Sequence, residues 1–68
     1  MPARHSLSGR EVFIEITTIG AYAKVVAIDS TTGTEVSITG PADASRATLE
    51  AGALRKLQFV LNKRSAKD

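Results

Sequence analysis

The stretch GAYAKVVAIDSTTGTEVSITGP, residues 20–41, decides the fold of this 68-residue chain. Valine, isoleucine, tyrosine and threonine dominate it, glycine and proline bound it, and a polar segment at residues 29–34 interrupts it. This composition is typical of two β-strands joined by a turn. Asp29 can accept hydrogen bonds from the amides ahead of it, and Gly33 can adopt a positive φ. The sequence therefore predicts a central hairpin whose loop is residues 30–33.

The expected register of this hairpin pairs Ala27 with Val36 and Lys24 with Thr39. It gathers aliphatic side chains on one face of the sheet, which we take as the core side: Ala23, Val25, Ala27, Val36 and Ile38. A slip by one residue would turn the polar residues of 34–39 inward, which argues against it. The small alanines of the middle strand leave room for a helix to approach.

Residues 10–17 alternate between polar and apolar side chains, as a half-buried strand does. Val12, Ile14 and Ile16 would face the core. A short loop over residues 18–21 would lead into the central strand, and its length predicts Glu15 opposite Lys24. Such an exposed pair contributes well under about 1 kcal/mol, but it favours that alignment.

The opposite face of the sheet would then be unusually apolar. It would carry Phe13, Tyr22, Val26 and Ile28, with Glu15 and Lys24 between them. Two interpretations compete, because much of any protein surface is apolar, whereas a contiguous apolar patch indicates a contact with a partner or a second copy.

Gly40 and Pro41 stop the last strand, since proline has no amide to donate. A helix over residues 43–62 is predicted to follow, with Asp43 or Ser45 as its cap. Its apolar residues fall on one stripe that would cover the core face of the sheet: Leu49, Ala53, Leu54, Leu57, Val60 and Leu61. Gly52 leaves open whether this helix is continuous or broken, because a mid-helix glycine costs about 1 kcal/mol relative to alanine.

Nine basic and seven acidic residues give a net charge of +2, and the basic excess lies near the C-terminus. Four cations and one aromatic residue there form a candidate nucleic-acid contact: Arg55, Lys56, Phe59, Lys63 and Arg64. The simpler interpretation is a solvated helix face whose cations suit the negative end of the helix dipole.

No residue forms a recognisable catalytic, cofactor or metal site. The chain has no cysteine and a single histidine, His5, and metal sites need several convergent ligands. The serines and threonines have no histidine partner in a folded segment, so a nucleophile would have no base. We therefore expect neither an enzyme nor a bound cofactor. Lacking a secretory leader or an apolar run of about 18 residues, the chain is expected in the cytoplasm.

The predicted fold is α+β: a three-stranded antiparallel meander followed by one C-terminal helix packed on one face (βββα). The strands would span residues 10–17, 22–29 and 34–39. Residues 1–9 would be a disordered lead-in, residues 10–63 the single domain and residues 64–68 a flexible basic tail. The outer strands would leave free backbone edges, which invite strand addition or dimerisation.

The chain also resembles a family of short bacterial proteins of unknown function. The resemblance rests on GAYAKV at 20–25, AID at 27–29, TGTEVSI at 32–38, Gly40-Pro41 and LRKL at 54–57, and extends over about residues 10–63. It implies no activity, cofactor or site residue. The leading hypothesis is a small non-enzymatic module that binds a protein partner or itself through the apolar outer face. The alternative is a nucleic-acid-binding domain, since the order βββα is similar to small DNA-binding domains of integrases and plant AP2-type factors.

Overall fold

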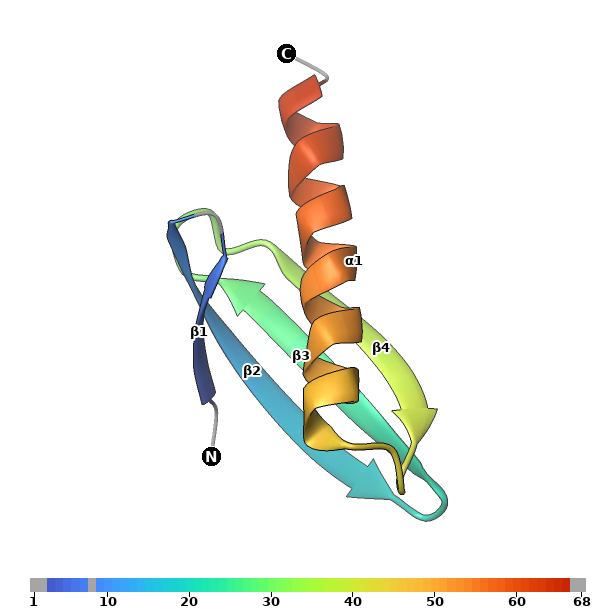
Figure 1. Cartoon of the computed structure of the whole chain (residues 1–68). Coiled ribbons are helices and arrows are strands. Elements are labelled where there is room, and N and C mark those ends of the chain that lie inside the picture. The colour runs from blue at the N-terminus through green and yellow to red at the C-terminus, as the bar shows by residue number, and fades with distance from the viewer. Residues whose placement is uncertain (1–2, 8, 67–68) are drawn as a thin grey trace.

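The computed structural model describes residues 3–7 and 9–66 of the chain. A four-stranded antiparallel sheet carries one helix on one of its faces (Figure 1). The elements are β1 (Ala3–Leu7), β2 (Arg10–Ile19), β3 (Tyr22–Asp29), β4 (Glu35–Pro41) and α1 (Arg46–Ala66). The predicted α+β class, antiparallel sheet and C-terminal helix are confirmed. The prediction of three strands is wrong, because β1 adds a fourth, so the order is not the βββα of the DNA-binding domains.

Strand β1 lies where the sequence led us to expect a disordered lead-in. It pairs antiparallel with β2 from Ala3↔Ile14 to Leu7↔Arg10. Main-chain pairing with β2 and the partly buried Leu7, which packs against the core, compensate for its weak apolar pattern. Since β1 occupies the outer edge of β2, the two edge strands of the sheet that the described residues form are β1 and β4.

The central hairpin has the predicted register, with Ala27 opposite Val36 and Lys24 opposite Thr39. At its loop, the amide of Asp29 donates to the carbonyl of Thr34 at 2.8 Å, and the amide of Gly33 donates to the carbonyl of Asp29 at 2.8 Å. Gly33 has a φ of 76°, which only glycine adopts without strain. The turn chemistry therefore fixes the register that the aliphatic pattern requires.

The hairpin of β2 and β3 is tighter than predicted. Ile19 pairs with Tyr22 and Thr17 with Lys24, so the turn consists of residues 20–21 alone. Gly20 adopts a φ of 58° in that turn. The expected pairing of Glu15 with Lys24 is wrong, because Glu15 lies opposite Val26. The register differs from the predicted one by two residues, which leaves every side chain on its predicted face.

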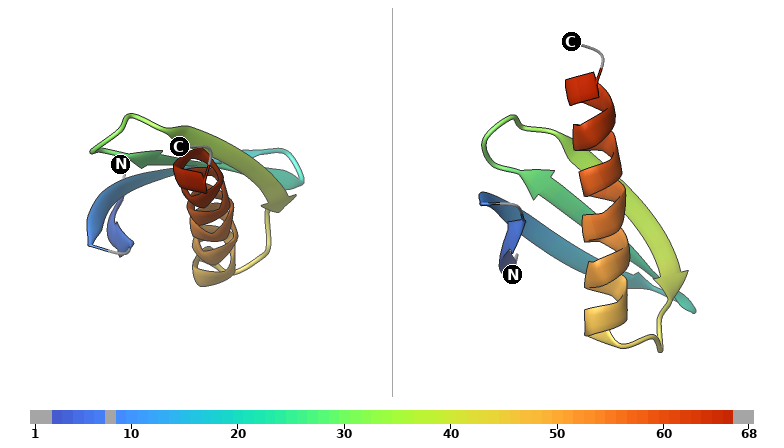
Figure 2. Two further views of the ribbon diagram at one scale, coloured as in Figure 1. Left: turned by 90° about the horizontal axis from the view of Figure 1, so that it is seen from above. Right: turned by 45° about the horizontal axis from the view of Figure 1, so that its top comes forward.

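The core lies between α1 and one face of the sheet, as the alternation predicted. The view from above in Figure 2 shows the helix on one side of the curved sheet and no element on the other side. Ten residues form the buried apolar cluster: Val12, Ile14, Ala23, Val25, Ala27, Val36, Leu49, Ala53, Leu57 and Leu61. Ile16 and Ile38 pack against it while remaining partly exposed.

Helix α1 begins after Ser45, whose Oγ accepts a hydrogen bond from the amide of Thr48 at 3.1 Å. It continues without a break through Gly52, where a Cβ would lie 2.9 Å from Cδ1 of Ile38. The glycine thus marks a close approach of the helix to β4. The helix also includes residues 64–66, which were predicted to belong to a flexible tail; residues 67–68 lie outside the described residues. No helix among the described residues is long and apolar enough to span a membrane.

Candidate functional site

The outer face of the sheet, meaning the face turned away from α1, holds the predicted apolar residues. Phe13 lies directly opposite Ile28 on the neighbouring strand, and Val26 is two residues along β3 from Ile28. These three side chains point to the same side and are each partly exposed. They form one contiguous apolar patch across β2 and β3, which we call the central patch.

Tyr22, the fourth predicted residue, lies apart from the central patch. The row of Thr17, Lys24 and Thr39 separates them. Tyr22 instead stands between Ile19 on β2 and Pro41 on β4. Ile19 and Tyr22 are each 47% exposed, so this row is a second apolar cluster at the β2–β3 turn.

Ile19 was not among the predicted site residues, because residues 18–21 were expected to form a loop. The apolar alternation of β2 ends at Ile16, so the available signal was the β-branched run Thr17-Thr18-Ile19, which suits a strand. In the paired strand Ile19 lies on the same face as Phe13. Pro41 was interpreted only as the end of a strand, although its ring also extends this row.

Strand β1 adds a cation to the outer face. The guanidinium of Arg4 lies 5.7 Å from the centre of the Phe13 ring, and its Nη1 is 3.4 Å from Oε2 of Glu11. Both contacts are exposed, and each contributes at most about 1 kcal/mol. The guanidinium of Arg4 nevertheless lies over one face of the Phe13 ring. The prediction could not include Arg4, because residues 1–9 were taken as disordered.

The charges of the outer face are mixed and slightly negative. The strands place five charged side chains on it: Arg4, Glu11, Glu15, Lys24 and Glu35. Three carboxylates against two cations give this face a net charge of −1, so it does not attract phosphate groups.

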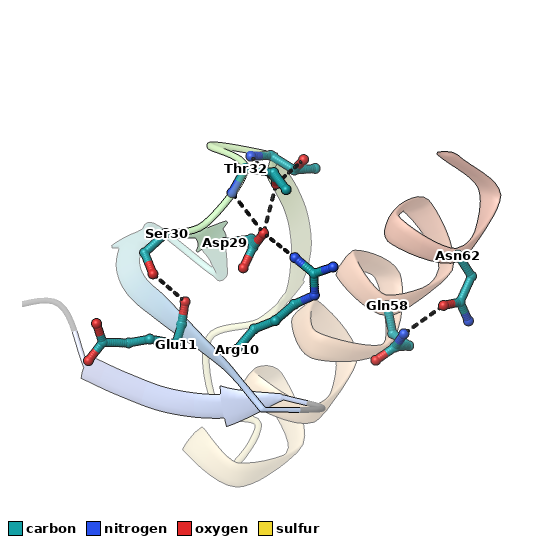
Figure 3. A network of polar contacts seen from close by, with 8 residues as sticks. Arg10, Glu11, Asp29, Ser30, Thr32, Gln58 and Asn62 are labelled. Carbon is teal, nitrogen blue, oxygen red and sulfur yellow. Dashed lines mark hydrogen bonds and ion pairs between the residues drawn. The ribbon is translucent and has the colours of Figure 1, made fainter. Parts of the chain in front are cut away.

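On the core side, a buried carboxylate organises the far end of the sheet. Figure 3 shows Oδ2 of Asp29 between the hydroxyl of Thr32, at 2.7 Å, and Nη1 of Arg10, at 3.0 Å. The amide of Thr32 donates to the same oxygen at 3.1 Å. The Thr32 hydroxyl bond, together with the Arg10 charge, holds the pKa of Asp29 below its ordinary value despite burial, which acts in the opposite direction.

This Asp29 cluster is best explained as part of the turn. It satisfies a loop amide, anchors Arg10 of β2 and closes the end of the core. Oδ1 of Asp29 is buried and has no hydrogen-bond partner among the described residues, and Asp29 belongs to no group of three or more His, Asp and Glu side chains there. The cluster therefore positions the β3–β4 loop.

His5 has a structural contact that was not predicted. Its Nε2 lies 3.3 Å from Oε1 of Glu50, and Nε of Arg46 donates to Oε2 of the same carboxylate at 2.8 Å. Glu50 thereby connects β1 with the first turns of α1. Within residues 3–7 and 9–66, no group of three or more His, Asp and Glu side chains could hold a metal ion.

A shallow hollow at the β1–β2 end collects two arginines and the histidine. It has a volume of about 370 Å³ and is lined by Arg4, His5, Ser6, Gly9, Arg10 and Glu11. Each of these three side chains already contacts a carboxylate. Arg4 contacts Glu11, His5 contacts Glu50, and Arg10 contacts Asp29. The hollow is thus not a preformed anion site.

The predicted basic residues lie on α1, away from the outer face. Arg55, Lys56 and Lys63 are exposed, and Phe59 is 65% exposed. Lys56 alone has a described contact with the sheet, because its Nζ donates to the carbonyl of Ser37 at 2.9 Å. Arg64 is helical, but its side chain lies outside what the structure describes.

Taken together, these features define a small α+β domain with one helix-covered sheet face and one uncovered face. Residues 9–64 match a family model described as a domain of unknown function, DUF6898, and the chain belongs to that family. Neither the comparison with curated proteins nor the comparison with solved structures gave a match.

Proposed function

We propose that this protein is a small non-enzymatic interaction module that contacts another protein surface, either a partner or a second copy, through its outer sheet face. The observation that supports the proposal is the central patch, where Phe13, Val26 and Ile28 lie side by side on the face that α1 leaves uncovered. Apolar side chains grouped in this way favour a contact with another protein more than isolated exposed ones do.

The size of the face indicates what kind of contact it supports. Strand β3 has eight residues and the sheet four strands. With a rise of about 3.3 Å per residue and about 4.8 Å between strands, the face measures about 500 Å². Two such surfaces bury about 1,000 Å² in total, which is the lower end for a specific complex. The proposed contact is therefore small and reversible.

Mutation of the patch tests the proposal. Val26→Asp would place a carboxylate in the centre of the patch, whereas Ala51→Asp would place one on the exposed side of α1 as the matched control. We expect light scattering over a wide concentration range, or capture of one defined partner, to show an association that Val26→Asp abolishes and Ala51→Asp leaves intact. Two results together would count decisively against this function. The protein would be a monomer at every concentration, and it would capture no partner whose binding is lost in Val26→Asp.

Nucleic-acid binding is the alternative proposal, and the exposed cations beside Phe59 favour it. It would use Arg55, Lys56, Phe59 and Lys63, with Arg64 following on the same helix. Titration of labelled DNA and RNA at two salt concentrations tests it, because phosphate contacts weaken steeply as salt rises. Binding that is insensitive to the change of Lys63 and Arg64 to alanine would exclude it.

We also propose that the protein is bacterial and acts in the cytoplasm. The pattern quoted above, from GAYAKV to LRKL, supports a bacterial source. The chain has no cysteine, which fits a reducing cytoplasm.

A further inference from the structure

The free edge of β4 presents main-chain groups that a further strand could use. The hydrogen bond from Asp29 to Thr34 identifies that pair as a bonded one, so the bonded pairs alternate along the hairpin at Val36 and Ile38. The amides and carbonyls of Glu35, Ser37 and Thr39 therefore point away from β3, toward the edge. Pro41 ends this row, since it has no N–H.

A stripe of α1 runs alongside that edge. Gly52 approaches Ile38 of β4, and Lys56 reaches the carbonyl of Ser37. Residues 52, 56, 59 and 63 follow the spacing i, i+4, i+7, i+11, so they share one side of the helix. Lys56, Phe59 and Lys63, which we call the basic stripe, thus form a row that meets the edge of β4 at Lys56 and continues along the helix from there. The opposite side of the helix carries Glu50, which faces β1.

The basic stripe lacks a carboxylate partner in the described structure. The carboxylate of Glu50 contacts Arg46 and His5 instead. Arg55, the residue before Lys56, is also exposed and adds a third cation to this part of the helix. The stripe therefore favours an acidic occupant over a neutral or a basic one.

A second copy of the chain fits this edge poorly. Pairing β4 with another β4 would bring two basic stripes together, and like charges repel. Lysine at an exposed strand edge is a common protection against such pairing.

We propose that the edge of β4 binds an extended acidic segment of another protein by strand addition. An acidic side chain of the added strand draws the ammonium of Lys56 away from Ser37, and the freed carbonyl then accepts a main-chain N–H of that strand. Phe59 packs against a side chain of the added strand that points toward α1, and Lys63 pairs with a second carboxylate of that strand. This surface is separate from the outer face, so the two proposals can fail independently.

The test uses the full chain and synthetic peptides. The probe is a fluorescent, end-capped peptide of about six residues, the length of an average strand, in which glutamate alternates with valine. The controls are the same peptide with lysine for glutamate, the acidic peptide with N-methylated alternate amides, and single-stranded oligothymidylate. Binding is followed by fluorescence anisotropy, and amide NMR spectra locate the contact.

We expect the acidic peptide to shift the amide signals of Glu35, Ser37 and Thr39, and the basic and N-methylated peptides to bind far more weakly. Lys63→Ala should weaken binding about two- to fivefold, as loss of one exposed ion pair does, while Lys24→Ala on the outer face should not. Lys56→Ala should reduce the preference for the acidic over an all-valine peptide.

Three results would overturn the proposal. The first is an absence of amide shifts along β4 at peptide concentrations near about 1 mM, where even weak complexes form. The second is equal binding by the N-methylated peptide, which would mean that main-chain pairing is not used. The third is binding of oligothymidylate to the basic stripe without any binding of the peptide, which would assign this surface to nucleic acid.

Discussion

The contact between Gly52 and Ile38 allows a sharp test of how α1 sits on the sheet. A Cβ at position 52 would lie 2.9 Å from Cδ1 of Ile38, whereas ordinary contacts are 3.4–4 Å. Gly52→Ala gains about 1 kcal/mol of helix propensity. It also forces the end of the Ile38 side chain off its rotamer, which costs about 0.5–1.5 kcal/mol. The two effects nearly cancel, so this change alone should alter stability by less than about 0.5 kcal/mol.

The cancellation disappears when the obstructing methyl group is removed. Ile38→Val deletes Cδ1, at a cost of its own of about 0.5–1.5 kcal/mol. In that background Gly52→Ala should stabilise the protein by about 1 kcal/mol, which corresponds to about 4–8 °C in the melting temperature of a domain this size. The coupling between the two positions is then about 0.5–1.5 kcal/mol.

Urea unfolding of the four proteins, followed by far-UV circular dichroism, measures this coupling. A domain of 68 residues is expected to have a total stability of about 3–10 kcal/mol, so the effect is measurable. Ala51→Val and Gly52→Val provide a second comparison. Only a valine at position 52 projects toward β4, so only Gly52→Val should lower the free energy of unfolding by about 1–3 kcal/mol through overpacking. If Gly52→Ala has the same effect with isoleucine and with valine at position 38, the close approach is refuted.

Three further outcomes are expected. Leu57→Ala should cost about 2–5 kcal/mol in urea unfolding, because Leu57 is fully buried; a loss below about 1 kcal/mol would contradict its place in the core. Ser45→Ala should cost about 0.5–2 kcal/mol by removing the cap of α1, whereas Ser45→Asp should preserve it. The pKa of Asp29 is lowered by its bond from Thr32, so its contribution to stability is complete above the ordinary value of 3.8 and is lost as pH falls through the lower native value. Thermal unfolding at a series of pH values should therefore show a steeper acid loss in the wild type than in Asp29→Asn, and equal slopes would contradict the assignment.

The face of the sheet on which each side chain lies was predictable, because apolar side chains face the core and polar side chains face water. Val12, Ile14, Val25 and Val36 turn inward as the alternation predicted. The register between β2 and β3 was not fixed by the same pattern, because a shift by two residues leaves every face unchanged. The attraction expected between Glu15 and Lys24 was too weak to decide it. The two-residue turn with Gly20 at positive φ decides it instead.

The missed elements depend on contacts distant in sequence. Strand β1 has little apolar periodicity, and the contact of His5 with Glu50 joins residues 45 positions apart, so local pattern could not reveal either. Similarly, the continuity of α1 through Gly52 reflects its approach to Ile38, which propensity alone does not contain. For the candidate site, the central patch followed from parity, whereas Arg4 and the row of Ile19, Tyr22 and Pro41 required the observed pairing.

The simple strand order has a consequence for how the chain reaches its native state. Each strand pairs with its immediate neighbour along the chain, so every hairpin closes over a short loop. Such a low contact order predicts rapid folding for a protein that contains so much sheet. During synthesis the four strands leave the ribosome before α1 does, so their aliphatic face waits uncovered until the last segment of the chain emerges. The helix therefore completes folding, and a chain truncated before residue 46 should aggregate rather than persist as a soluble sheet.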